Sequence, residues 1–271
     1  MFKINNLTYQ YDKTRKALDN VSMDFNKGNI IGIIGSNGSG KSTLFNNLMG
    51  ILKSTEGEIL YNGEQIKYDK KSLYNLRKEV GIVFQDPEKQ IFYSMVYDDI
   101  AFALRNIGID EKTIKERIHT ALEAVNGLQF IDRPVHNLSF GQKKRVAIAS
   151  VVAMENKLVL LDEPTAGLDP ISTRAIVDII KGLNKRGVKI VISSHDMNLI
   201  YEICDYVYVL NQGVLINEGT REEVFINEEK IDEAGLELPW LVKLHKNMGL
   251  ALFTREEDLY SYWNHREQKT V

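Results

Sequence analysis

The sequence predicts an α/β protein built around a parallel β-sheet, and three short apolar runs carry this prediction. They are residues 29–34 (NIIGII), 157–162 (KLVLLD) and 188–195 (VKIVISSH). Strands buried on both faces of a parallel sheet read as continuous apolar runs, and strands that alternate with helical patterns favour a parallel core. The chain has 271 residues, which is enough to bury a full core.

The first apolar run ends at a glycine-rich loop, GSNGSGKST, which we call the phosphate loop. It matches the pattern G-x-x-x-x-G-K-[ST] and is followed by an expected helix at 44–49, closed by Gly50. Glycines let successive backbone N–H groups point at phosphate oxygens, and the helix N-terminus adds its positive end. Lys41 is expected to reach the β- and γ-phosphates, and Ser42 to ligate Mg²⁺. The predicted nucleotide-binding residues are Gly35, Ser36, Asn37, Gly38, Ser39, Gly40, Lys41, Ser42 and Thr43.

Apolar alternation before this unit predicts an antiparallel layer. One set is Phe2, Ile4 and Leu7, and the second is Val21, Met23 and Phe25. Further along, the pair Asn62-Gly63 lies between two short strand patterns and favours a tight hairpin turn.

The middle of the chain is predicted to be more helical than its surroundings. Ile114, Ile118, Leu122 and Val125 recur at helical spacing within residues 110–127. After the second apolar run, residues 171–183 also predict a helix. The last 45 or so residues change in composition, with alternating charge and a second group of aromatic residues, and are interpreted as a small C-terminal extension.

Two carboxylates follow the second apolar run. Asp162, at the strand end, is predicted to hold Mg²⁺, and Glu163 to accept a proton from the water that attacks the γ-phosphate. Without the phosphate loop, the two residues would be interpreted as solvated carboxylates at a strand end, but the presence of that loop in the same chain favours the catalytic interpretation. A base that serves water predicts a hydrolase rather than a kinase.

Two more residues follow predicted strands and therefore fall at the edge of the sheet where ligands bind. His195 is expected to contact the γ-phosphate and order the attacking water; a hydrogen-bonded loop histidine is the structural alternative. Gln85 follows the short apolar stretch GIVF and is a candidate ligand of Mg²⁺, although this pattern alone is weakly specific.

The amino-acid composition excludes several classes of function. The formal net charge is −3, which gives no indication of nucleic-acid binding. The single cysteine, Cys204, excludes an internal disulfide and a thiolate zinc cluster. No run approaches the roughly 18 apolar residues of a membrane-spanning helix. The basic runs Lys70-Lys71 and Lys143–Arg145 are interpreted as solvated faces.

These residues, in this order, resemble the ATP-binding cassette ATPases. The resemblance covers about residues 1–224. It includes the phosphate loop, Gln85, VLLDEP and His195, and identifies the stretch LSFGQ (Leu138–Gln142) as the family's signature segment. It also identifies AGLD, which ends at Asp169, as the D-loop. An aromatic residue near the N-terminus stacks on adenine in this family, and Tyr11 is preferred over Tyr9 for that role.

The resemblance implies a mechanism in which ATP and Mg²⁺ bind at a head-to-tail dimer. Each phosphate loop would face the signature segment of the other subunit. Ser139 and Gly141 would then donate hydrogen bonds to the γ-phosphate held by that subunit, with Gln142 completing the segment. One departure is visible, because the commonest signature has a second glycine where this chain has Phe140.

A narrower resemblance is to the ATPases of energy-coupling-factor importers of the cobalt/nickel type. FQDPEKQIF, LSFGQKKRVAIA and the tail segment AGLELPWLVKLHKNMGL carry it. It implies an ATPase domain at 1–224 with a helical subdomain at about 86–150, and an extension at 225–271 that helps pair two ATPases. It also implies a peripheral position on the cytoplasmic face of the cell membrane. The implied partners are a second ATPase subunit, identical or related, an integral membrane coupling protein and a substrate-binding membrane subunit.

The transported substrate implied by this resemblance is a micronutrient, either a transition-metal ion such as cobalt or nickel or a vitamin. The alternative function is a cassette ATPase that acts on the ribosome or DNA. Members of that kind usually carry two cassettes or a long coiled-coil insertion. This chain has one phosphate loop and no sustained heptad run.

Overall fold

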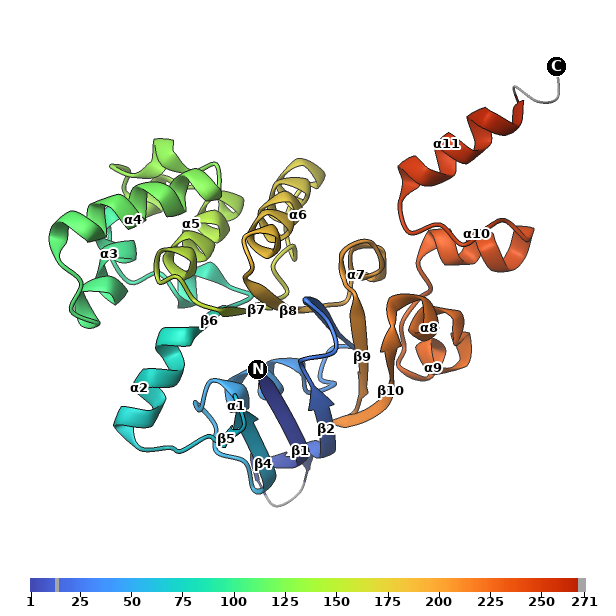
Figure 1. Cartoon of the computed structure of the whole chain (residues 1–271), viewed down its shortest axis with the longest axis horizontal. Coiled ribbons are helices and arrows are strands. Elements are labelled where there is room, and N and C mark those ends of the chain that lie inside the picture. Colours follow the sequence, from blue (N-terminus) through green and yellow to red (C-terminus); the bar gives the residue numbers. More distant parts are fainter. Residues whose placement is uncertain (13–14, 268–271) are drawn as a thin grey trace.

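The computed structural model describes residues 1–12 and 15–267 and contains two β-sheets (Figure 1). The larger sheet has six strands in the order β10-β9-β3-β8-β7-β6. All neighbouring strands are parallel except β9 and β10, so the predicted parallel core is confirmed. Its strands are β3 (Ile30–Ile34), β6 (Val80–Val83), β7 (Leu158–Asp162), β8 (Lys189–Ser194), β9 (Tyr206–Asn211) and β10 (Val214–Thr220).

The central strands of this sheet are apolar throughout because both of their faces are covered. Side chains alternate between two cores along each strand. Ile31 and Leu160 face a core shared with the small sheet and α1, whereas Ile30 and Leu161 face the core that contains most of the other helices. Burial on both faces therefore explains the continuous apolar runs in the sequence.

The smaller sheet is antiparallel, with strand order β2-β1-β4-β5. Ile4 pairs with Met23 and Leu7 with Val21, which confirms the predicted antiparallel layer. Asn62 and Gly63 both have positive φ, at 52° and 84°, and form the predicted two-residue turn. The strands are β1 (Phe2–Gln10), β2 (Lys16–Asp24), β4 (Glu56–Tyr61) and β5 (Glu64–Gln65).

Helix α1 (Lys41–Leu48) begins three residues earlier than the sequence predicts. It starts immediately after Gly40, whose φ of 106° is left-handed and stops the helix from extending further back. A Cβ on Gly40 would lie 2.6 Å from the carbonyl oxygen of Ala17, so only glycine fits there. Helix α6 (Pro170–Lys185) also begins earlier than expected, by one residue, because proline is favoured in the first helical turn.

The helices between β6 and β7 form a separate group at one end of the large sheet (Figure 1). They are α3 (Val96–Asn106), α4 (Glu111–Ala124) and α5 (Phe140–Ala153), and they pack against one another. Helix α4 matches the helix predicted at 110–127, with Asp110 as its N-cap. Helix α2 (Lys70–Glu79) precedes β6, and short 3-10 helices occur at 87–89, 128–130 and 135–137.

The chain ends in a series of helices on the opposite side from α3–α5 (Figure 1). They are α8 (Arg221–Ile226), α9 (Glu228–Glu233), α10 (Trp240–Met248) and α11 (Glu256–Glu267). Helix α7 (Met197–Ile203) comes earlier, between β8 and β9. The expected domain boundary at 224/225 falls inside α8, where Val224 and Phe225 are fully buried. The last four residues of the expected extension lie outside the described residues. Among the helices of residues 1–12 and 15–267, none is both long and apolar enough to cross a membrane.

Candidate functional site

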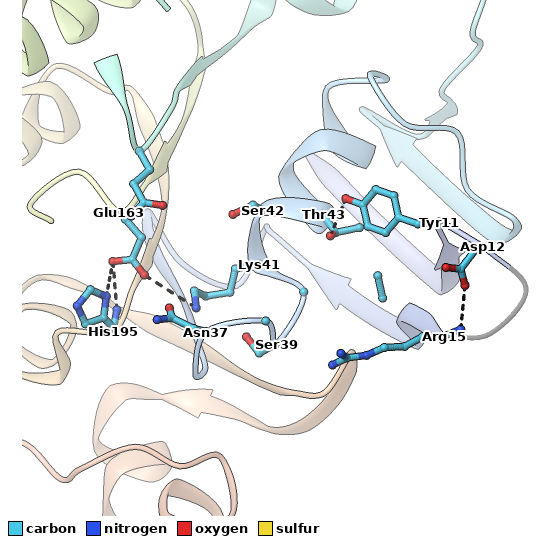
Figure 2. A pocket seen from close by; sticks show the side chains of 14 residues that line it. Tyr11, Asp12, Arg15, Asn37, Ser39, Lys41, Ser42, Thr43, Glu163 and His195 are labelled. Atoms are coloured by element: carbon cyan, nitrogen blue, oxygen red, sulfur yellow. Dashed lines mark hydrogen bonds and ion pairs between the residues drawn. The ribbon is translucent and has the colours of Figure 1, made fainter. Parts of the chain in front are cut away.

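A cavity of about 540 Å³ lies at the carboxyl ends of the parallel strands (Figure 2). Loops that follow β3, β6, β7 and β8 contribute to it, because the ends of parallel strands meet at one edge of a sheet. It brings together residues predicted from five separate parts of the sequence. These are Tyr11, Asn37, Gly38, Ser39, Gly40, Lys41, Ser42, Thr43, Gln85, Glu163 and His195.

The phosphate loop curls around the ammonium of Lys41. Lys41 Nζ donates to the carbonyl oxygens of Gly35, at 2.7 Å, and Ser36, at 3.2 Å. Burial lowers the pKa of Lys41, an effect that the nearby carboxylates of Glu163 and Asp162 partly offset. The partial desolvation of this cation strengthens its attraction for an anionic ligand.

Two observations show that the loop suits a phosphate group. Gly38 has a φ of 79° and open space where a Cβ would stand, so its backbone can approach a ligand closely. The hydroxyl of Ser39 is buried within the loop and has no hydrogen-bond partner in the part of the chain that the structure describes. An orphaned donor of this kind fits a phosphate oxygen.

The cavity is bounded on its outer side by residues near the N-terminus. Tyr11 is 64% exposed, lies edge-on to Tyr9 and shares a hydrogen bond of 3.2 Å with the hydroxyl of Thr43. Its exposed ring is free to stack on a planar ligand. Arg15 also lines the cavity, although the sequence analysis did not single it out. No motif marks Arg15, which reaches the cavity only through the fold of β1 and β2.

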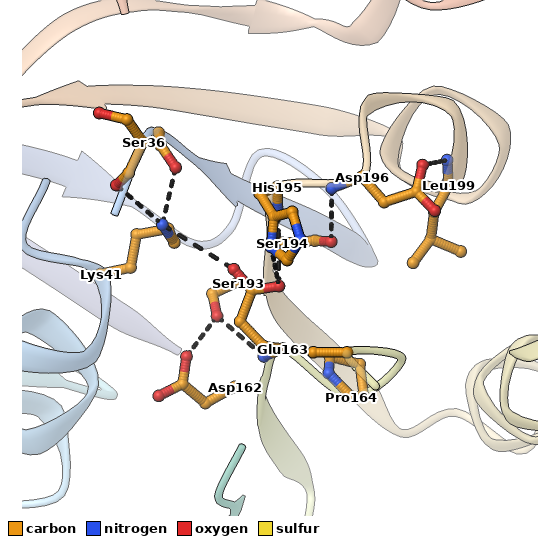
Figure 3. A network of polar contacts seen from close by, with 12 residues as sticks. Ser36, Lys41, Asp162, Glu163, Pro164, Ser193, Ser194, His195, Asp196 and Leu199 are labelled. Atoms are coloured by element: carbon orange, nitrogen blue, oxygen red, sulfur yellow. Dashed lines mark hydrogen bonds and ion pairs between the residues drawn. The ribbon is translucent and has the colours of Figure 1, made fainter. Parts of the chain in front are cut away.

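Glu163 lies at the centre of a polar network (Figure 3). Its Oε2 is 2.8 Å from Nδ1 of His195, and its Oε1 is 3.9 Å from Nζ of Lys41. Its backbone has a φ of 46°, a left-handed conformation that costs a glutamate about 1–3 kcal/mol. The structure holds this conformation by bonding the amide of Glu163 to the carbonyl oxygen of Ser193. A buried carboxylate beside a histidine is suited to accept a proton from water.

Ser193 is a site residue that the sequence analysis missed. Its hydroxyl donates to Oδ1 of Asp162 at 2.5 Å and accepts from the amide of Glu163 at 3.1 Å. The parallel register pairs Asp162 with Ser193 across β7 and β8, which explains the contact. In the sequence, two serines just before His195 indicate that a hydroxyl lies near the site. Only the strand register shows that Ser193 is the one that contacts Asp162.

The candidate Mg²⁺ ligands are oxygen donors, as this hard cation prefers. Ser42 and Gln85 are exposed to the cavity, and Asp162 is buried behind it with one oxygen held by Ser193. Among the described residues, no group of three or more His, Cys, Asp or Glu side chains is arranged to hold a metal ion. Mg²⁺ that is shared with substrate phosphates needs only one or two protein carboxylates, so this donor set fits it.

The LSFGQ segment lies outside this cavity and caps α5 instead. Oγ of Ser139 accepts from the amide of Gln142 at 3.3 Å, and Oε1 of Gln142 accepts from the amide of Ser139 at 2.9 Å. Asp169 similarly caps α6, where its bonds to Ser172 lower the pKa of its carboxyl. Ser139, Gly141, Gln142 and Asp169 are therefore not brought to the phosphate loop of their own chain.

The interpretation of the run Lys143–Arg145 as a solvated face is wrong for Lys144. This side chain is 1% exposed, and its ammonium donates to the carbonyl oxygens of Glu163, Pro164 and Ala166. Residue 144 shares a face of α5 with the buried Ile148, four residues later, so its stem packs inward. The other predicted basic run, at Lys70-Lys71, is exposed as expected.

Comparisons with known proteins agree with this geometry. A model of the family described as ABC transporter matches residues 18–166. A putative ABC transporter ATP-binding protein of Listeria monocytogenes is 50% identical, covering 97% of this chain and 98% of its own. The cobalt import ATP-binding protein CbiO of Salmonella typhimurium is 45% identical, covering 99% and 97%. The energy-coupling factor transporter ATP-binding protein EcfA of Methanosphaera stadtmanae is 43% identical, covering 92% and 89%.

Two solved structures extend the similarity to three dimensions. The cbiO1 structure from Clostridium perfringens, described as part of the ABC transporter complex cbiONQ, has a TM-score of 0.78 and 41% identity. It covers 90% of this chain and 98% of its own. A dimeric ATP-binding cassette in a post-hydrolysis state, bound to ADP and Pi, has a TM-score of 0.73 and 28% identity, covering 82% and 99%.

Proposed function

The chain belongs to the ABC transporter family and is an ATP-hydrolysing subunit of that family, and we propose that it powers a micronutrient importer of the energy-coupling-factor type. Similarity to CbiO and EcfA supports the importer part of this proposal. One observation carries its catalytic part: a single cavity gathers the phosphate loop, Gln85, Glu163 and His195, while the LSFGQ segment lies outside it. The site of this chain is therefore suited to bind ATP but lacks the surface that would close over the γ-phosphate.

A second ATPase subunit, either a copy of this chain or a related one, supplies the missing surface in our proposal. Ser139 and Gly141 of each subunit contact the γ-phosphate held by the other. The cap of α5 supports this role, because Oγ of Ser139 accepts a bond from within the helix and keeps its own hydrogen for an external acceptor. A solved relative is dimeric and bound to ADP and Pi, which supports the presence of a second subunit.

Within each closed site, the residues of this chain have distinct roles. Glu163 accepts a proton from the attacking water, and His195, bonded to Glu163 through Nδ1, orients that carboxylate and turns its other nitrogen to the γ-phosphate. Ser42, Gln85 and Asp162 would hold Mg²⁺, which would supply charge neutralisation at the phosphate oxygens. Tyr11 stacks on adenine. Loss of the γ-phosphate removes the contact between subunits and opens the dimer.

The proposed contact with an integral membrane coupling protein lies on an exposed aromatic surface formed by Phe92, Tyr93 and Phe102. Phe92 is 79% exposed, and the rings of Tyr93 and Phe102 lie 5.3 Å apart. Asp99 fixes this surface, because its Oδ1 accepts from the amides of Phe92 and Tyr93 at 2.8 and 3.1 Å. Exposed aromatic groups of this kind mark interaction sites. The surface follows Gln85 in the chain, which links it to the ATP site.

Replacing Phe92 and Phe102 by serine should separate ATP hydrolysis from transport. We expect the purified variant to hydrolyse ATP at close to the wild-type rate, because neither ring lines the ATP cavity. Assembled with its membrane partners in lipid vesicles, it should lose ATP-dependent uptake by about tenfold or more, as for an interface anchor. Uptake is measured with labelled cobalt and nickel ions first, because one relative is named as a cobalt importer, and then with vitamins.

The matched control is Tyr74→Ser, which removes an aromatic side chain of 41% exposure from α2. It should transport normally. Wild-type complexes that hydrolyse ATP but take up none of these substrates would overturn the importer proposal. Normal uptake by the Phe92/Phe102 variant would show that the aromatic surface is not the contact with the membrane protein.

We propose that the C-terminal extension helps to pair the two ATPases. Met248, Tyr260 and Trp263 are 63%, 56% and 47% exposed, and they surround a hollow of about 490 Å³ between α10 and α11. Its other lining residues are mainly leucines, at positions 244, 250 and 259. A cluster of this composition favours an apolar partner surface such as the same helices of a second subunit.

Trp263→Asp should therefore weaken dimerisation measured by sedimentation without nucleotide. We expect the dissociation constant to rise by about 30-fold, since buried tryptophans are typical interface anchors. Ile51→Asp, which places the same charge on another exposed apolar residue, should leave the constant unchanged. Equal constants for the wild type and Trp263→Asp would exclude this role.

A further inference from the structure

The N-terminal end of α5 is hydrogen-bonded to the turn that carries the candidate general base. We call residues 163–169, between β7 and α6, the catalytic turn. Lys144 Nζ donates to the carbonyl oxygens of Glu163 at 2.9 Å, Pro164 at 3.0 Å and Ala166 at 3.0 Å. An ammonium has three donors, and these three carbonyls use all of them. One buried side chain therefore fixes three carbonyls among the first four residues of the catalytic turn.

Burying the ammonium of Lys144 costs desolvation free energy, so simple packing does not account for a lysine at this position. Lys144 is 1% exposed, and burial lowers its pKa to about 8 despite the attraction of the nearby carboxylates. Burying a charged lysine in this way is unfavourable unless its hydrogen bonds are complete. The bonds also hold the backbone next to Glu163, whose left-handed φ of 46° needs support from its surroundings.

Neighbouring residues of the LSFGQ segment extend the same contact. The ring of Phe140 lies over the ammonium of Lys144, with 5.4 Å between Nζ and the ring centroid. The ring also approaches Gly167, where an added Cβ would stand 3.5 Å from Cε1 of Phe140. A Cβ on Gly141 would come within 3.1 Å of Oγ of Ser172. The segment thus packs close to the catalytic turn at Gly167 and to the first turn of α6 at Ser172.

We propose that Lys144 is a positioning residue that links the LSFGQ segment to Glu163 of the same chain. The inference rests on the proposed function, in which the LSFGQ segment contacts the ATP of one site and Glu163 serves the other. When Ser139 takes hold of ATP in the first site, the shift of α5 is passed through Lys144 to the backbone of Glu163 in the second. The two sites of the dimer are then coupled through a contact that lies within one subunit. The ring of Phe140, which replaces the usual glycine, shields this link from water.

The test is Lys144→Met, which keeps the apolar stem and removes the ammonium. Lys144 does not line the ATP cavity, so the ATP concentration at half-maximal rate should change less than about threefold. The value of kcat should fall by about 10- to 100-fold, as expected when a catalytic group is misplaced. The Hill coefficient for ATP should also fall toward 1, because coupling between sites is lost. Lys144→Arg, which can still donate to several carbonyls, should recover most of kcat.

The matched control is Lys189→Met. Lys189 is another lysine whose pKa is lowered by burial and whose ammonium bonds to a backbone carbonyl, that of Phe25, far from the catalytic turn. A purely structural role for Lys144 predicts that both variants lose thermal stability and keep kcat per folded molecule, and that result would overturn the proposal. If Lys144→Met does not fold, Lys144→Gln replaces it; because glutamine is shorter, uncharged and has two donors in place of three, kcat should fall by less than in the methionine variant, again with little change in the half-saturating ATP concentration.

The effect of Phe140 supplies an independent check. Phe140→Gly should lower kcat in the wild-type background but change it by less than about twofold when Lys144 is already methionine, since residues that act through one contact are non-additive. Independent, additive effects would show that the ring does not act through Lys144. A different variant tests the proposed function itself. If Glu163 were not the general base, Glu163→Gln would hydrolyse ATP at the wild-type rate, whatever the result for Lys144→Met.

Discussion

Glu163→Gln is expected to bind ATP normally and to lose hydrolysis almost completely. Glutamine has the shape of glutamate and can keep the contact with His195, but it cannot take a proton from water. General-base catalysis contributes about 10²- to 10⁴-fold, so kcat should fall within that range. Because the γ-phosphate persists, the variant should accumulate as an ATP-bound dimer. Phosphate release measures the first effect, and sedimentation with ATP and Mg²⁺ measures the second.

Glu111→Gln is a suitable control for the lost charge. Glu111 is exposed on α4, where it pairs with Arg105 far from the cavity, and its replacement should leave kcat and the dimer equilibrium unchanged. Turnover at the wild-type rate in Glu163→Gln would rule out Glu163 as the base. Loss of turnover without accumulation of a dimer would support Glu163 as the base but contradict the proposal that hydrolysis opens the dimer.

Ser139→Arg is expected to abolish hydrolysis while leaving the affinity for ATP within about twofold, because a residue that binds the other subunit's ATP acts mainly on the transition state. The loss of one positioned donor to a developing charge costs about 10²- to 10³-fold in kcat. Nucleotide binding is measured by fluorescence titration and hydrolysis by phosphate release. A variant that hydrolyses ATP normally would return the LSFGQ segment to a purely structural role.

The substitution also removes the cap of α5, worth about 1 kcal/mol, so this effect needs its own control. Thr220 caps α8 through the same kind of reciprocal pair, with Glu223. Thr220→Arg should lower stability by a similar amount and leave hydrolysis intact. Ser139→Asp separates the two roles further, because aspartate keeps the cap and repels the γ-phosphate, so it should fold normally and fail to hydrolyse ATP.

The sequence was sufficient to predict the parallel core. It was also sufficient for those parts of the candidate site that consist of residues adjacent in the chain or that follow a predicted strand. The phosphate loop is a contiguous motif between a strand and a helix, and its residues 37–43 line the cavity, whereas Gly35 and Ser36 do not line it and bond to Lys41 through their carbonyl oxygens. Gln85, Glu163 and His195 could be placed in the same cavity because each follows a strand of one parallel sheet. Their catalytic roles stay predictions until the variants are measured.

The parts that could not be predicted depend on contacts between distant segments. Ser193 reaches Asp162 only through the register of β7 and β8, which the sequence does not specify. Lys144 was interpreted as solvated because it stands in a basic run, whereas its partners are backbone carbonyls that no motif marks. Arg15 lines the cavity because of how two strands pair. In each case, tertiary structure decides the environment of a side chain whose identity gives no signal.

The reciprocal cap between Ser139 and Gln142 has a consequence for how strongly two subunits can hold each other. Folding of α5 fixes the serine rotamer, so its conformational entropy is lost before any partner arrives. Ordering a side chain at an interface otherwise opposes association by about 0.5–1.5 kcal/mol. The segment is thus preordered, and in the proposed dimer it would meet the second subunit without a loop having to rearrange at the moment of closure.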